Sequence, residues 1–130
     1  MEFFRIVDSR STEEELIERL SLDKLEQITN EFILLEAKSL NEALIGGIWG
    51  EFTLNRQIIK GGLRFSLVEC PNALTWTVTT GYPPSRDSIV IHLTINRDRK
   101  QQEFLDEIEL FLDDHCLCLA NMFSVVISSN

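Results

Sequence analysis

The sequence predicts one α+β domain over residues 1–130, in which a four-stranded antiparallel meander follows N-terminal helices and a long C-terminal helix packs on one sheet face. Three observations lead to this fold class. Between residues 63 and 95 apolar and polar side chains alternate with a period of two, as in strands with one buried face. Short turns separate these runs, and consecutive strands joined by short turns pair antiparallel. Residues 98–123 then carry an apolar stripe with helical spacing, wide enough to cover such a sheet.

The first 45 residues are expected to be mostly helical, after a short apolar arm at residues 3–7. Thr12 and Glu15 have the spacing of a capping box, and three consecutive acids stand at the positive end of the helix that would begin there. Residues 24–45 again fit one helical stripe, which favours a second helix. A strand at residues 32–35 is the alternative, because four consecutive apolar residues fit either structure.

Four strand candidates follow the glycine pair at residues 46–47. They span residues 51–59, 63–70, 74–80 and 88–96. The Lys60-Gly61-Gly62 segment is a turn, since glycine enters left-handed conformations at little cost. After the final helix, the β-branched residues 125–127 are expected to add an edge strand or to join a partner's sheet.

The composition excludes several classes of protein. An apolar content of 44% with 25% charged residues suits a soluble globular domain. The sequence has no apolar run that could cross a bilayer and no signal sequence, so no membrane partner and a cytoplasmic location (nuclear in a eukaryote) are expected. Three cysteines are an odd number and are expected to be reduced thiols. The net charge of −9 argues against nucleic acid and suits a basic protein surface, self-association as a homodimer, or solubility alone.

Two segments resemble a known family. Residues 41–52 look like the exit of a helix into a first strand, and residues 74–83 look like a third strand that ends in Tyr82-Pro83. A helix, a four-stranded meander with a Tyr-Pro turn and a C-terminal helix together resemble the RWD domain over about residues 38–123. This family is the non-catalytic relative of the ubiquitin-conjugating enzyme fold, and the resemblance implies a protein–protein interaction module. The second proline of the family pattern is absent near Asp87.

Motifs for catalysis, metals and cofactors are absent. The ubiquitin-conjugating relatives need a cysteine after the fourth strand, and none lies between residues 96 and 115. His115, Cys116 and Cys118 are close in sequence, but side chains one or two residues apart on a helix diverge, so they are expected to be core residues rather than zinc ligands. No nucleophile elbow or phosphate-binding glycine loop is present. We therefore expect a protein that is not an enzyme and has no cofactor and no metal.

Four residues are the candidate binding residues. Trp49 and Tyr82 are aromatic side chains at a helix exit and a strand turn, where such residues often dominate interfaces. Arg64 and His92 share the polar face of the expected sheet with several threonines. The alternative is that the two aromatic residues cap the ends of the core and the polar face is simply solvated.

The main functional hypothesis is an adaptor that binds a protein partner through the sheet face or edge and these aromatic residues. A first alternative is a small acidic chaperone or immunity-type protein that binds one cognate polypeptide. A second is a small-ligand sensor or enzyme that uses the polar sheet face around Arg64 and His92.

Overall fold

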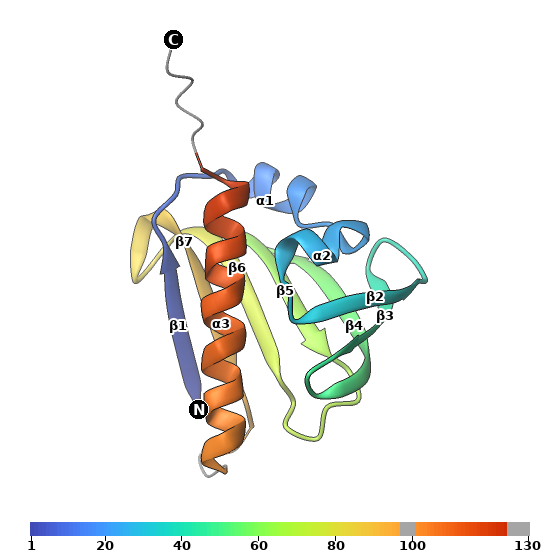
Figure 1. The fold of residues 1–130 in the computed structure, drawn as a ribbon. Coiled ribbons are helices and arrows are strands. Elements are labelled where there is room, and N and C mark those ends of the chain that lie inside the picture. The colour runs from blue at the N-terminus through green and yellow to red at the C-terminus, as the bar shows by residue number, and fades with distance from the viewer. Residues whose placement is uncertain (97–100, 125–130) are drawn as a thin grey trace.

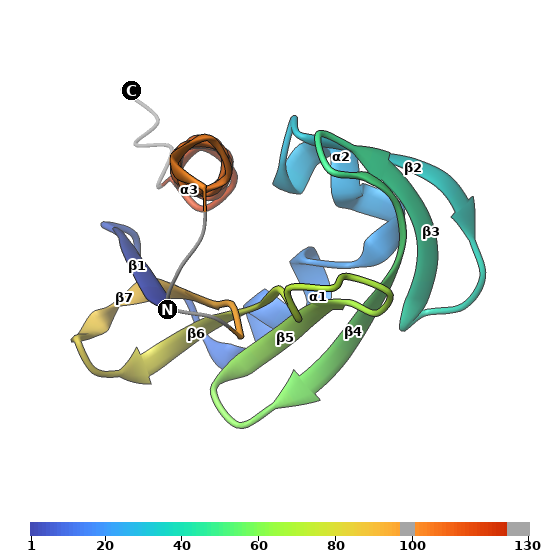
Figure 2. The same cartoon turned by 90° about the horizontal axis from the view of Figure 1, so that it is seen from below.

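A computed structural model describes residues 1–96 and 101–124 as one strongly curved antiparallel sheet with helices on its concave side (Figures 1 and 2). The sheet has seven strands in the order β1-β7-β6-β5-β4-β3-β2. The strands are β1 (Glu2–Val7), β2 (Phe32–Ala37), β3 (Glu42–Gly47), β4 (Gly50–Ile59), β5 (Gly62–Leu67), β6 (Thr75–Tyr82) and β7 (Ser85–Thr94). The helices are α1 (Glu13–Arg19), the 3₁₀ turn η1 (Leu22–Lys24), α2 (Leu25–Ile28) and α3 (Gln102–Met122).

The predicted four-stranded meander is wrong, because three further strands extend it at both edges. The apolar arm at residues 3–7 is strand β1, which pairs with β7 in a register that places Phe4 opposite His92. The predicted helix over residues 24–45 is also wrong. Only η1 and α2 are helical there, and β2 and β3 form a hairpin that continues the sheet from β4. The alternative of a strand at residues 32–35 is confirmed.

The central part of the prediction is confirmed. Strands β4 to β7 correspond to the four expected strands and pair consecutively. Gly61 has a φ of +91° in the β4–β5 turn, where glycine is favoured. The next residue, Gly62, lies so close to the neighbouring strand that a Cβ atom there would stand 2.0 Å from the Val78 carbonyl oxygen. The first helix begins as expected, with the Glu15 backbone N–H donating to the Thr12 hydroxyl (3.1 Å).

Helix α3 lies along the concave face and contacts β1 and α2 (Figure 2). Its buried side is formed by Ile108, Phe111, Leu112, His115 and Leu119. Two polar clusters hold it in place. At β1, Arg5 pairs with Glu109 and Asp113. At the α2–β2 connection, the Asp114 carboxylate accepts hydrogen bonds from the Thr29 hydroxyl (2.7 Å) and from the backbone and side chain of Asn30 (both 2.8 Å).

The cysteines are free thiols in the structure, and Cys116 and Cys118 lie on different sides of α3, near Ile6 and Asp114. Burial raises the pKa of both thiols. Within residues 1–96 and 101–124 no helix is long and apolar enough to span a membrane. The edge strand expected at residues 125–127 lies outside the described residues.

Candidate ligand-binding site

Aromatic rings fill the space between α3 and the concave face of the sheet. Trp76 from β6 lies at their centre, with its ring centroid 5.1 Å from that of Phe111 on α3 and 5.2 Å from that of Phe65 on β5. The set consists of Phe32, Trp49, Phe65, Trp76, Phe104, Phe111 and His115. Alternation places the strand residues of this set on the inner face, and the helical stripe places those of α3 opposite them.

His115 is fully buried in this aromatic interior. One of its ring nitrogens, Nδ1, lies 2.9 Å from the Ile28 carbonyl oxygen. Because a carbonyl oxygen only accepts, Nδ1 carries the proton, and Nε2 is a bare acceptor in the neutral ring. Burial lowers the pKa of His115 to about 4, against smaller opposing effects of the Ile28 hydrogen bond and of the Asp114 charge. The imidazole is therefore neutral at physiological pH.

Three buried nitrogen atoms of this interior have no hydrogen-bond partner among the described residues. They are His115 Nε2, Trp49 Nε1 and Trp76 Nε1. The first can accept a hydrogen bond, and the two indole N–H groups can donate one. Each unpaired buried group costs about 1–3 kcal/mol, so folded proteins rarely leave several of them together. Three such atoms in one interior indicate a site where a bound water or ligand can supply the missing hydrogen bonds.

A small pocket of about 190 Å³ opens at one end of this interior. The β3–β4 turn, the β5–β6 loop and the first turn of α3 line it, through Trp49, Phe52, Cys70, Pro71, Asn72, Leu74 and Phe104. A cavity of about 150 Å³ already accommodates a single aromatic ring. Trp49 and Phe104 pack edge to face, with centroids 5.9 Å apart, and Trp49 also contacts Phe111 (5.8 Å). Movement of the Trp49 indole would therefore connect the pocket to the buried interior.

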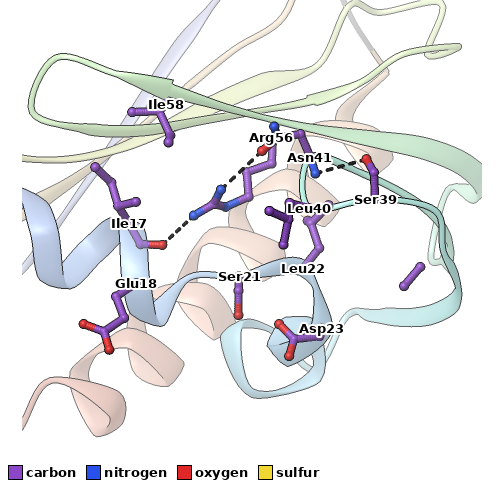
Figure 3. Close-up of a pocket in the computed structure, with 11 residues that line it drawn as sticks. Ile17, Glu18, Ser21, Leu22, Asp23, Ser39, Leu40, Asn41, Arg56 and Ile58 are labelled. Carbon is purple, nitrogen blue, oxygen red and sulfur yellow. Dashed lines mark hydrogen bonds between the residues drawn. The ribbon is translucent and has the colours of Figure 1, made fainter.

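A second and larger hollow, about 620 Å³, lies between α1, η1 and strand β4 (Figure 3). Its polar centre is Arg56 on β4, a residue only 7% exposed. The guanidinium donates to the Leu20 carbonyl oxygen (2.9 Å), to the Ile17 carbonyl oxygen and to Asn41 Oδ1 (3.3 Å). Burial lowers the pKa of this arginine.

The four residues predicted for binding do not form one site. Arg64 and His92 do share the convex, polar face, with Thr77 between them in the strand register. There His92 Nε2 lies 3.0 Å from a Glu2 carboxylate oxygen, and its ring stacks on Phe4.

The two aromatic candidates lie elsewhere. Trp49 is half-buried at the mouth of the interior described above. Tyr82 lies at the opposite end of β6, where a Cβ atom added at Gly61 would stand 2.5 Å from its ring. Tyr82 and Trp49 therefore stand at opposite ends of the sheet.

The sequence contained a signal for one residue that the prediction missed. Arg56 occupies an inward position between Leu54 and Ile58, where alternation calls for an apolar side chain. His115 was predicted to be a core residue, and Trp76 belongs to the apolar set of the alternating residues 63–95. Their unpaired nitrogens could not be predicted, because they depend on which groups surround them. The residues described in the structure contain no group of three His, Cys, Asp or Glu side chains that could hold a metal ion.

No known protein-family model matches the chain, and no curated protein matches its sequence. Solved structures do match its fold. An uncharacterised Bacillus thuringiensis protein superposes with a TM-score of 0.63 at 9% identity, covering 95% of this chain and 98% of that one. XoxI from Bacillus cereus gives 0.58 at 9% identity and covers 95% and 94%. A START-superfamily protein from Mycobacterium smegmatis gives 0.58 at 10% identity and covers 95% of each chain.

The chain shares the fold of these proteins, which include a START-superfamily protein. The resemblance to the RWD domain is therefore wrong, and the adaptor function that it implied loses its support. Tyr82-Pro83 does lie between two strands, β6 and β7, but they belong to a seven-stranded sheet that wraps around a helix. The pair misled the prediction because proline suits turns of many folds.

Proposed function

We propose that this protein binds a small, mostly apolar molecule with a hydrogen-bonding group in the interior between α3 and the concave face of the sheet. The observation that carries the proposal is the trio of unpaired buried nitrogens on Trp49, Trp76 and His115. Concave, mostly apolar sites with a few placed polar groups are the usual form of small-molecule sites. The likeness to a START-superfamily protein supports a small ligand over a protein partner. The unpaired nitrogens favour the concave interior rather than the polar face around Arg64 and His92.

The three unpaired nitrogens also indicate which hydrogen-bonding groups the ligand carries. His115 Nε2 needs a donor, and the indole N–H groups need acceptors. A hydroxyl group meets both needs, because its oxygen accepts while its hydrogen is donated. The surrounding rings favour an aromatic or alicyclic body, and the pocket of about 190 Å³ at the mouth suits a molecule with one ring. We therefore expect phenols and cyclic alcohols among the ligands.

We propose that the Trp49 side chain controls access to this interior. It lies in the short β3–β4 turn at the mouth and separates the pocket from Phe111, behind which Trp76 and His115 lie. The three unpaired nitrogens are shielded from solvent, so a ligand reaches them when the indole of Trp49 moves aside. Binding is then expected to alter the environments of both tryptophans.

The two tryptophans of the chain, Trp49 and Trp76, provide a direct test. Their indole N–H resonances can be followed by ¹H–¹⁵N NMR during titration with phenol and, in parallel, with benzene, which lacks the hydroxyl group. Phenol is expected to shift both resonances and to bind more tightly than benzene. The variant His115→Asn keeps a donor for Ile28 and removes the Nε2 acceptor, so it should reduce this preference.

His92→Asn on the convex face is the matched control and should leave phenol binding unchanged. If phenols and cyclic alcohols shift neither indole resonance, or if His115→Asn and His92→Asn bind phenol equally well, the proposal is wrong.

The expectations of a protein partner, of a homodimer and of a non-enzymatic role stay predictions.

A further inference from the structure

The groove beside Arg56 contains a buried cation without an anionic partner among the described residues. The guanidinium has five N–H groups, and the three hydrogen bonds to Ile17, Leu20 and Asn41 leave two. All three acceptors are neutral, and two of them are carbonyl groups near the C-terminal end of α1, the negative end of its dipole. A buried charge is normally paired with an opposite charge, so the two remaining N–H groups favour a carboxylate from outside.

The walls of the groove are apolar. Ile17, Leu22, Leu40 and Ile58 line it, and the side chains on its open side remain accessible. Leu40 is 83% exposed and Ile58 is 55% exposed. An aliphatic side chain laid between them would remove this apolar surface from water, which is favourable by about 25 cal/mol per Å².

Two carboxylates stand on the far side of the groove. Figure 3 shows Glu18 and Asp23 on the helical segments, across from the strand that carries Arg56. Both side chains are exposed, and a hydrogen bond with Ser21 lowers the pKa of Asp23. The charged lining residues are therefore one cation at the floor and two anions at the rim. A simple anion would be repelled by the rim, and a simple cation would be repelled by Arg56.

We propose that this groove binds a zwitterion with an aliphatic side chain, that is, a free apolar amino acid or a short apolar peptide. The ligand carboxylate accepts from the two remaining N–H groups of Arg56, its ammonium group faces Glu18 and Asp23, and its side chain lies against Leu40 and Ile58. The groove is separate from the aromatic interior under α3, so this proposal does not depend on the proposed function.

Four probe molecules separate the contributions of the carboxylate and of the ammonium group to binding. Leucine and leucyl-leucine have both charges at two different spacings, 4-methylpentanoate has only the carboxylate, and isoamylamine has only the ammonium group. Binding is measured on the full chain by isothermal titration and by the Arg56 Nε–H resonance. At least one of the two zwitterions is expected to bind at least about tenfold more tightly than either single-charge probe, and to shift that resonance.

The variants change exposed residues. Arg56 itself is not substituted, because its hydrogen bonds to Ile17 and Leu20 attach α1 to β4, and their loss would disturb the fold. Leu40→Ser and the double variant Glu18→Gln/Asp23→Asn should each weaken binding by at least about threefold, a modest change as expected of exposed groups. Leu117→Ser, at a residue 67% exposed on α3, is the matched control and should bind as the unmodified protein does. The proposal is overturned if neither zwitterion binds, if either single-charge probe binds as well as the better zwitterion, or if Leu40→Ser and Leu117→Ser behave alike.

Discussion

Lowering the pH should destabilise this protein through His115. The pKa of the buried ring is about 4 in the folded state, and it returns to about 6.5 when unfolding exposes the ring to water. Between these two values the unfolded state binds one more proton than the folded state, so the free energy of unfolding falls as the pH falls. The stabilisation is complete above about pH 6.5, and the total loss by pH 4 is about 3 kcal/mol, at 1.36 kcal/mol per pKa unit.

Urea unfolding at about pH 7.5 and about pH 5 tests this magnitude, because His115 should cost about 2 kcal/mol between those conditions. Carboxylates also begin to titrate in this pH range and change the free energy of unfolding. The unmodified protein is therefore compared with His115→Asn, which retains a donor for the Ile28 carbonyl but does not titrate. The smaller side chain lowers stability at every pH, and the informative quantity is the change with pH. The variant should lose about 2 kcal/mol less than the unmodified protein. Equal losses in the two proteins would refute the reasoning.

Three further substitutions test the fold. Thr12→Ala removes the hydroxyl that caps α1 at the Glu15 N–H and should lower the free energy of unfolding by about 1 kcal/mol in urea titrations, whereas Thr12→Ser should be nearly neutral. Gly62→Ala brings a Cβ within 2.0 Å of the Val78 carbonyl oxygen and should cost more than about 2 kcal/mol; a Tm within a degree of the unmodified protein would contradict the strand spacing. Arg5→Ala breaks two exposed ion pairs to α3 and should cost at most about 1 kcal/mol; the cost should shrink in high salt, and a salt-independent loss would indicate a packing role instead.

The candidate sites could be predicted only in part. Side-chain alternation correctly placed Arg64 and His92 on one polar face, since the side chains of paired strands follow a common register. It also placed Trp76 inside. It could not show that the indole of Trp76 and one nitrogen of His115 are left unpaired, because that depends on the neighbours that β6 and α3 bring together. Trp49 was selected for its exposure, but its position at the mouth of the interior follows from the β3–β4 pairing.

Local patterns in the sequence by themselves determined β4 to β7, the start of α1 and the extent of α3. These elements carry their own signals: a period of two, a period near 3.6, a capping residue and glycine turns. Tertiary structure alone decided the rest. Residues 3–7 are a strand because β7, more than 80 residues later, offers a free edge, and residues 32–37 are a strand because β3 pairs with them. Short apolar segments have no decisive local preference for helix or strand, so the long-range hydrogen bonds of the sheet set their structure. The same hydrogen bonds form the curved interior proposed here as a binding site.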